Sequence, residues 1–258
     1  MKIVLIGAGN VATQLGRAFN EKGFPVVQVY SRTLSAAQAL GKKLHTDYTH
    51  RLQDITTQAD GYVFSVSDTA LPLLLKSFPA TTGIWVHTAG SIPMDIFKDS
   101  AATRYGVFYP LQTFSKRRKI SFNHIPIFFE ANSPQDEHLL QQIALSLSDT
   151  AIPLSSEKRK YLHLAAVFAC NFTNHLYDIA AQILEDQAID RKVLLPLIAE
   201  TAAKVRTLSP REAQTGPAAR YDLPVIERQL ELLKTDPDKQ AIYRILSQDI
   251  LRRYPHEE

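Results

Sequence analysis

Hydrophobic residues in the first half of the chain follow two alternating spacings. Short apolar runs, each long enough for a buried parallel strand, are followed by segments whose apolar residues recur as on one face of a helix. The predicted strands begin at Ile3 and then cover residues 26–30, 61–66, 83–87, 105–108, 126–131 and 150–153. The predicted helices start after Gly9 and then cover residues 34–43, 68–77 and 134–148. This alternation predicts a doubly wound α/β sheet.

The second half of the chain shows helical spacing alone. From about residue 155 the sequence predicts helices over residues 158–184, 190–208, 222–233 and 238–254. We therefore expect two domains, an α/β domain over residues 1–153 and an all-α domain over residues 154–258.

The first predicted strand ends in a turn, Gly7-Ala8-Gly9-Asn10-Val11-Ala12, with the pattern G-x-G-x-x-A. In such a turn the first glycine permits the bend, the second lets the backbone approach a pyrophosphate, and the alanine lets the helix pack closely. The helix start also offers free N–H groups to phosphates. The turn predicts a dinucleotide site in a Rossmann fold; the alternative is a strand-turn-helix that uses glycine for geometry alone.

The residues after the second strand indicate which dinucleotide binds. An NAD-preferring site carries Asp or Glu there to hold the ribose 2'-hydroxyl. This chain has Ser31-Arg32-Thr33 instead, with no acidic residue between Phe24 and Thr46. Because Arg32 offers paired donors for a 2'-phosphate, we expect NADP(H) rather than NAD. The alternative is that Ser31 or Thr33 caps the next helix and Arg32 is solvated.

Ligands of doubly wound sheets lie outside the carboxyl ends of the strands. The residues that follow the later strands are small, polar or turn-forming, as a cofactor-facing rim requires. Besides residues 7–11 and 31–33, we therefore expect cofactor contacts from Val66, Ser67, Asp68, Thr88 and Ala89, and substrate contacts from Gln112 and Thr113.

The helix predicted over residues 158–184 has two different faces. At 100° per residue, one third of its circumference carries His163, Val167, Cys170, Asn171, Asn174 and Asp178. The opposite face carries Phe168, Phe172, Leu176, Ile179 and Ile183, and we expect it to be core. The polar face predicts the lining of a cleft; the alternatives are a solvent-facing stripe or a buried hydrogen-bond network.

Composition places the chain among ordinary globular proteins, with 258 residues, 45% of them hydrophobic, and a net charge of +3. With Cys170 as the single cysteine no disulfide can form within the chain, so we expect a reducing, cytoplasmic location. No segment approaches the length of a membrane span. The basic cluster 116–119 reads as a solvated loop or as a phosphate-contacting edge. We expect no nucleic-acid partner and, without a paired-histidine motif, no metal.

These segments resemble a superfamily of NADP-dependent reductases. It includes pyrroline-5-carboxylate reductase, the NADP oxidoreductases that use the deazaflavin coenzyme F-420, and the 6-phosphogluconate and 3-hydroxyacid dehydrogenases. More closely, the chain resembles a bacterial family of Rossmann-type oxidoreductases with a helical C-terminal domain and no assigned reaction. That resemblance rests on residues 7–12, 31–33, 87–91, 109–114, 163–171 and 215–222.

The chain also departs from these patterns. Dehydrogenases of the 3-hydroxyacid type carry a catalytic lysine four residues before an asparagine of this helix. If Asn171 matches that asparagine, the lysine position holds Val167, which disfavours lysine-dependent alcohol oxidation. Tyr221 stands where the uncharacterised family often has glycine.

The leading hypothesis is an NADPH-dependent reductase that transfers hydride to a C=N or C=O bond of a small substrate held between the domains. His87 could donate a proton or could bond the backbone beside the cofactor. His163, Asn171 and Asn174 could position the substrate, and Arg220 could clamp a carboxylate or pair with Asp222. The alternative is a sensor or scaffold that binds NADP(H) without turnover. The related families commonly dimerise through their helical domain, so we expect a homodimer.

Overall fold

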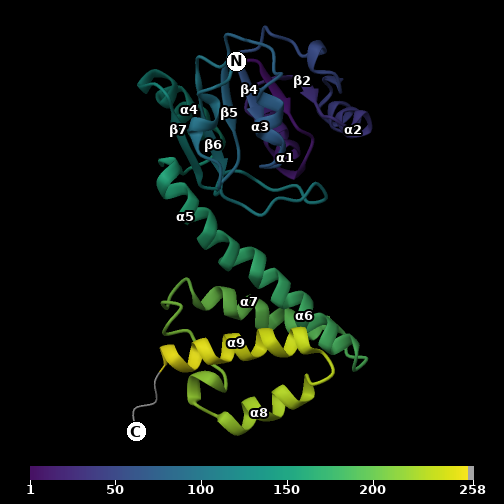
Figure 1. Ribbon diagram of the computed structural model, residues 1–258, viewed down its shortest axis with the longest axis vertical. Coiled ribbons are helices and arrows are strands. Elements are labelled where there is room, and N and C mark those ends of the chain that lie inside the picture. The colour runs from purple at the N-terminus through teal and green to yellow at the C-terminus, as the bar shows by residue number, and fades with distance from the viewer. Residues whose placement is uncertain (255–258) are drawn as a thin grey trace. The chain divides into compact units, whose positions relative to one another are not determined.

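The computed structural model describes residues 1–254 (Figure 1). The chain divides into two compact units, Met1–Cys170 and Asn171–Glu258. The sheet ends at Pro153, next to the predicted domain boundary, but the first unit continues through the following helix to Cys170.

The first unit is built on one eight-stranded sheet with the order β3-β2-β1-β4-β5-β6-β7-β8. All neighbouring strands are parallel except β6 and β7, which are antiparallel. The order of the first six strands is that of dinucleotide-binding sheets. The strands are β1 Ile3–Ile6, β2 Val26–Tyr30, β3 Asp47–Thr49, β4 Gly61–Phe64, β5 Ile84–His87, β6 Tyr105–Pro110, β7 Ile127–Ala131 and β8 Ala151–Pro153.

Helices cover both faces of this sheet, and the alternation of side chains along each strand divides the core between them. Ile3 and Leu5 of β1 pack in one cluster with residues of α1, α2 and α4, while Val4 and Ile6 pack in a second cluster with residues of α3. The helices of the unit are α1 Asn10–Glu21, α2 Leu34–Leu44, α3 Ala70–Leu75, α4 Pro134–Leu147 and α5 Ser156–Ala166. The predicted doubly wound fold is confirmed.

One strand of the sheet was missed by the apolar pattern. β3 has the sequence Asp-Tyr-Thr and lies at the edge of the sheet, where Asp47 and Tyr48 are exposed. An edge strand of three residues needs no apolar run because only one neighbouring strand covers it.

The second unit is helical, as predicted. It contains α6 Thr173–Glu185, α7 Leu195–Lys204, α8 Leu223–Leu232 and α9 Pro237–Arg253. Two of these helices begin at an aspartate, Asp222 or Asp236, whose side chain accepts a hydrogen bond from the backbone N–H three residues later. Such caps satisfy N–H groups that have no partner within the helix. None of the helices in the described chain is long and apolar enough to cross a membrane.

The helix predicted over residues 158–184 is interrupted. A π-helical segment, Val167–Phe172, lies between α5 and α6. Its turns are wider than those of an α-helix, so one value of 100° per residue cannot assign faces across it. The predicted core face was also wrong: Phe168 is 63% exposed, Phe172 49% and Leu176 37%.

Candidate functional site

The carboxyl ends of four strands lie side by side at one edge of the sheet. The last residue of β1, Ile6, is in register with the last residues of β2 and β4, Tyr30 and Phe64. Phe64 is in turn in register with His87 at the end of β5. The segments that follow these strands therefore meet at the edge where doubly wound sheets bind ligands.

A cavity of about 460 Å³ lies at this edge. Its lining includes much of the predicted cofactor set, namely Gly7, Ala8, Gly9, Ser31, Arg32, Thr33, Val66 and Ser67. Leu73 and Leu74 of α3, together with Leu52 after β3, add apolar side chains to the wall. The structure thus brings the glycine turn and the Ser31-Arg32-Thr33 corner into one pocket.

The backbone geometry requires glycine at the first of the two glycines of the turn, Gly7, but not at the second, Gly9. Gly7 has φ +115°, and a Cβ there would lie 2.3 Å from the carbonyl oxygen of Ser65, so the backbone geometry requires it. Gly9 has φ −79°, which any residue can adopt, and the nearest atom to an added Cβ would be 3.9 Å away. Gly9 precedes α1 without a side-chain cap and leaves open space at the helix start. Geometry alone therefore does not explain the second glycine.

The corner after β2 presents its polar side chains to the pocket. Arg32 and Thr33 are exposed, and Ser31 is half-buried with its N–H bonded to the carbonyl of Thr49 at 3.1 Å. Thr33 occupies the N-cap position of α2, but its side chain makes no capping hydrogen bond. The capping alternative therefore does not account for the hydroxyl of Thr33.

The remaining predicted cofactor residues lie outside the lining of this cavity. Asn10 accepts a hydrogen bond from the N–H of Lys116 at 3.2 Å, and Val11 packs against the core. Asp68 accepts one from Ser91, while Thr88 donates to Ser65 at 3.3 Å. Ala89, the last of them, follows Thr88 after β5. Their contacts with a cofactor stay predictions.

His87 is fully buried at the end of β5. Burial, together with the nearby Arg159 guanidinium, lowers its pKa to about 3, so the ring is neutral at physiological pH. Its Nδ1 accepts a hydrogen bond from the N–H of Ala89 at 3.2 Å, and the ring lies against Phe97. This geometry favours the second interpretation of His87, a ring that orders the backbone.

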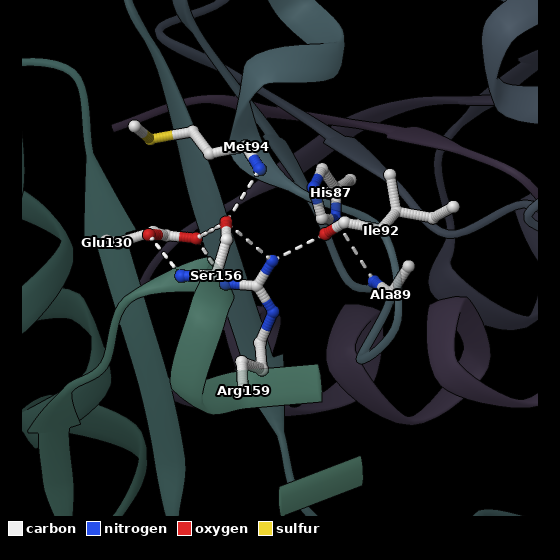
Figure 2. A network of polar contacts seen from close by, with 7 residues as sticks. All are labelled: His87, Ala89, Ile92, Met94, Glu130, Ser156 and Arg159. Atoms are coloured by element: carbon white, nitrogen blue, oxygen red, sulfur yellow. Dashed lines mark hydrogen bonds and ion pairs between the residues drawn. The ribbon is translucent and has the colours of Figure 1, made fainter. Parts of the chain in front are cut away.

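A buried ion pair between Arg159 and Glu130 connects the start of α5 to the sheet (Figure 2). Arg159, 1% exposed, pairs with the Glu130 carboxylate on β7 and donates to the carbonyl of Ile92. Ser156 donates its N–H to Glu130 at 2.8 Å and accepts from the N–H of Met94 at the same distance. Sequence reasoning missed this network; its one signal was an acidic residue, Glu130, near the end of an apolar strand.

His163 lies one helical turn after Arg159 and contacts Tyr109 near the end of β6. Its Nδ1 lies 3.0 Å from the hydroxyl oxygen of Tyr109. The ring also lies against Gly90, where an added Cβ would come within 2.5 Å of Nδ1. The sequence placed Tyr109 at a strand end but gave it no role.

The other predicted site residues belong to both units. Gln112 and Thr113 are exposed after β6, with the N–H of Thr113 bonded to the Gln112 side chain at 2.8 Å. Asn171, Asn174 and Arg220 are exposed residues of the second unit. Their roles toward a substrate stay predictions.

The sheet order, the glycine turn and the pocket define a Rossmann-type nucleotide-binding protein with a helical C-terminal region. In sequence, residues 1–77 match the family described as shikimate/quinate 5-dehydrogenase, and residues 125–250 match a domain of unknown function, DUF2520. A solved structure from Bacteroides fragilis, described as a "putative NADP oxidoreductase", is 47% identical over 97% of this chain and 98% of its own, with a TM-score of 0.93. The chain belongs to the same family as that protein, a family of Rossmann-type oxidoreductases.

Two further solved structures share the fold at lower identity. A 1-pyrroline-5-carboxylate reductase from Streptococcus pyogenes is 13% identical, covering 98% of each chain with a TM-score of 0.65. A reductive aminase from Aspergillus terreus, in complex with NADPH and ethyl-5-oxohexanoate, is 13% identical over 99% of this chain and 96% of its own, with a TM-score of 0.75. No curated protein matches the chain in sequence. The predicted family resemblance is confirmed.

Proposed function

We propose that the chain binds NADP(H) in the pocket at the carboxyl ends of β1, β2 and β4 and reduces a C=N or C=O bond of a small substrate. The observation that carries this proposal is that one cavity contains both the glycine turn and Arg32. The family relative is described as an NADP oxidoreductase, and two proteins of the same fold are named as a pyrroline-5-carboxylate reductase and a reductive aminase.

The pocket offers a partner for each part of the adenosine half of the cofactor. The open space at Gly9 and the uncapped start of α1 suit the pyrophosphate, because the first N–H groups of a helix lack partners within it. Arg32, with the hydroxyls of Ser31 and Thr33, suits the 2'-phosphate. Leu73, which is 69% exposed at the wall of the pocket, offers an apolar surface for the adenine ring.

The nicotinamide half would extend along the same edge toward the ends of β4 and β5, where Thr88 and Ala89 lie. When bound, NADPH supplies the hydride, and the protein supplies orientation and a proton. The proposed substrate contacts remain Gln112, Thr113, Asn171, Asn174 and Arg220.

We further propose a homodimer formed through the helical unit. Large apolar side chains of that unit are exposed, among them Val193, Leu197, Leu232 and Ile245. Such a surface is typical of an interface between copies of a chain rather than of a free monomer.

The proposed activity is tested with the purified chain and NADPH. Binding is measured by fluorescence titration, and oxidation of NADPH is followed at 340 nm with a panel of cyclic imines, 2-ketoacids and aldehydes. Turnover of at least one carbonyl or imine probe supports the reductase. Tight NADPH binding without oxidation by any probe would contradict it and favour a sensor.

A further inference from the structure

A tyrosine and a histidine from distant parts of the chain meet at the edge of the sheet. Tyr109 is the penultimate residue of β6, and His163 lies in the last two turns of α5. The hydroxyl oxygen of Tyr109 and Nδ1 of His163 are 3.0 Å apart, and the two rings are close to perpendicular, with centroids 6.1 Å apart. The contact is therefore a hydrogen bond between two packed rings.

The histidine ring is held on more than one side. Gly90, in the loop after β5, has no side chain, and any Cβ there would collide with the ring. Arg159, four residues before His163 and therefore on the same face of α5, is anchored to Glu130 and to the carbonyl of Ile92. Tyr109 itself packs with Val107 and Phe128 in a buried cluster. Both rings thus occupy defined positions in the first unit.

This position lies on the same sheet edge as the proposed cofactor pocket. The pocket is built at β2, β1 and β4, and β5 and β6 are the next strands in order. A dinucleotide whose adenosine half fills the pocket would carry its reactive ring toward the ends of β5 and β6. Gly90 lies in the loop after β5, and Tyr109 lies near the end of β6. The ring of His163 contacts both residues.

We propose that His163 donates the proton of the reduction from its Nε2 and that Tyr109 is the positioning residue that holds its Nδ1. The proposal rests on the proposed reductase function. Because Tyr109 occupies Nδ1, Nε2 is the ring nitrogen left for a substrate. His163 is half-buried, so a small molecule can reach it, whereas His87 is fully buried.

The step balances with groups that are present or supplied by the cofactor. Hydride from NADPH goes to the carbon of the C=N or C=O bond, whose π electrons move to nitrogen or oxygen. The imidazolium of His163 gives its Nε2 proton to that atom and becomes neutral imidazole, with Nδ1–H donated to Tyr109. Water then returns a proton to Nε2.

The charged groups around the pair are consistent with these roles. Burial raises the pKa of Tyr109, with Arg159 acting in the opposite direction and Cys170 in the same one, so Tyr109 keeps its proton at neutral pH. The guanidinium of Arg159 is paired with Glu130. The Tyr109 hydroxyl can therefore accept a hydrogen bond from Nδ1–H of His163, or donate one when Nδ1 carries no proton.

The contact is tested first by ¹⁵N NMR of the histidine-labelled chain, with the His163 signal assigned from His163→Gln. Neutral His163 is expected as one tautomer, fixed by the hydrogen bond between its Nδ1 and Tyr109, and as a mixture of tautomers in Tyr109→Phe. The matched control Tyr105→Phe, at the start of the same strand, should leave the signal unchanged. Identical His163 signals in wild type and Tyr109→Phe would overturn the positioning role.

The proton transfer is tested by kinetics with the imine or ketoacid that the wild type reduces fastest. His163→Gln should lower kcat roughly 100-fold, since a general acid contributes on the order of 10²–10⁴. Tyr109→Phe should lower kcat by roughly tenfold with KM little changed, and Tyr105→Phe should do neither.

Wild-type kcat in His163→Gln would overturn the donor role while the reductase stands. Failure of every probe would overturn the reductase and the donor role with it. The ¹⁵N NMR measurement would then still decide whether Tyr109 fixes the tautomer of His163.

Discussion

The two units differ in how they use their apolar residues. In the first, buried side chains form two extended clusters, one on each face of the sheet, with Leu5, Trp85 and Phe97 among those completely enclosed. In the described part of the second, only Ala218 and Ile226 are buried hydrophobic residues. Large apolar residues of that unit, such as Leu197 and Leu232, are exposed at 63% and 81%.

In the proposed dimer, this difference separates a unit that buries its apolar residues within itself from one that buries them against a second copy of the chain. Strands covered by helices on both faces bury nearly every apolar residue they carry. The four helices of the second unit leave large apolar side chains exposed, and the proposed second copy of the chain would cover them.

The largest effect should come from the buried ion pair of the first unit. Arg159→Met leaves the Glu130 carboxylate partly buried without its guanidinium, which should cost about 3–5 kcal/mol of stability. Hydrogen exchange should show lost protection in β7 and α5 and unchanged protection in α8 and α9. The neighbouring Lys160→Met, which removes an exposed pair with Glu157, is the control and should change neither. Equal protection in Arg159→Met and wild type would contradict this account of the network.

The second effect should appear on the apolar surface of the second unit. Leu197→Glu places a charge within the proposed interface and should convert a dimer into a monomer at micromolar concentration, as measured by sedimentation velocity. Leu145→Glu, at a similarly exposed leucine of α4 in the first unit, should leave the dimer intact. A wild-type chain that sediments as a monomer would show that the exposed residues need no second copy.

A smaller effect should distinguish alanine substitutions at the two glycines of the turn, one of which should lower stability and the other NADPH affinity. Gly7→Ala forces a Cβ against Ser65 at a positive φ and should destabilise the chain by about 1–3 kcal/mol in urea unfolding. Gly9→Ala meets no such contact, so it should keep its stability while binding NADPH more weakly. Unchanged NADPH affinity in Gly9→Ala would mean that the second glycine does not face the cofactor.

The sequence predicted those features that local patterns encode. Apolar runs gave most of the strands, and the pocket was found because residues 7–9 and 31–33 are contiguous segments at strand ends. The edge strand β3 was missed because it is short and polar, and the π-helical segment because periodicity assumes a regular helix. Contacts such as that of Tyr109 with His163 join residues far apart in the chain, and no spacing rule reveals them.

The most direct test of the account is the affinity of Arg32→Ala for the two dinucleotides. Charge-assisted hydrogen bonds contribute about 1.5–3 kcal/mol each, so loss of the guanidinium should weaken NADPH binding by roughly 10- to 100-fold. NADH lacks the 2'-phosphate and should bind wild type and variant almost equally in fluorescence titrations. Equal weakening of both dinucleotides would contradict an NADP(H) site at Ser31-Arg32-Thr33.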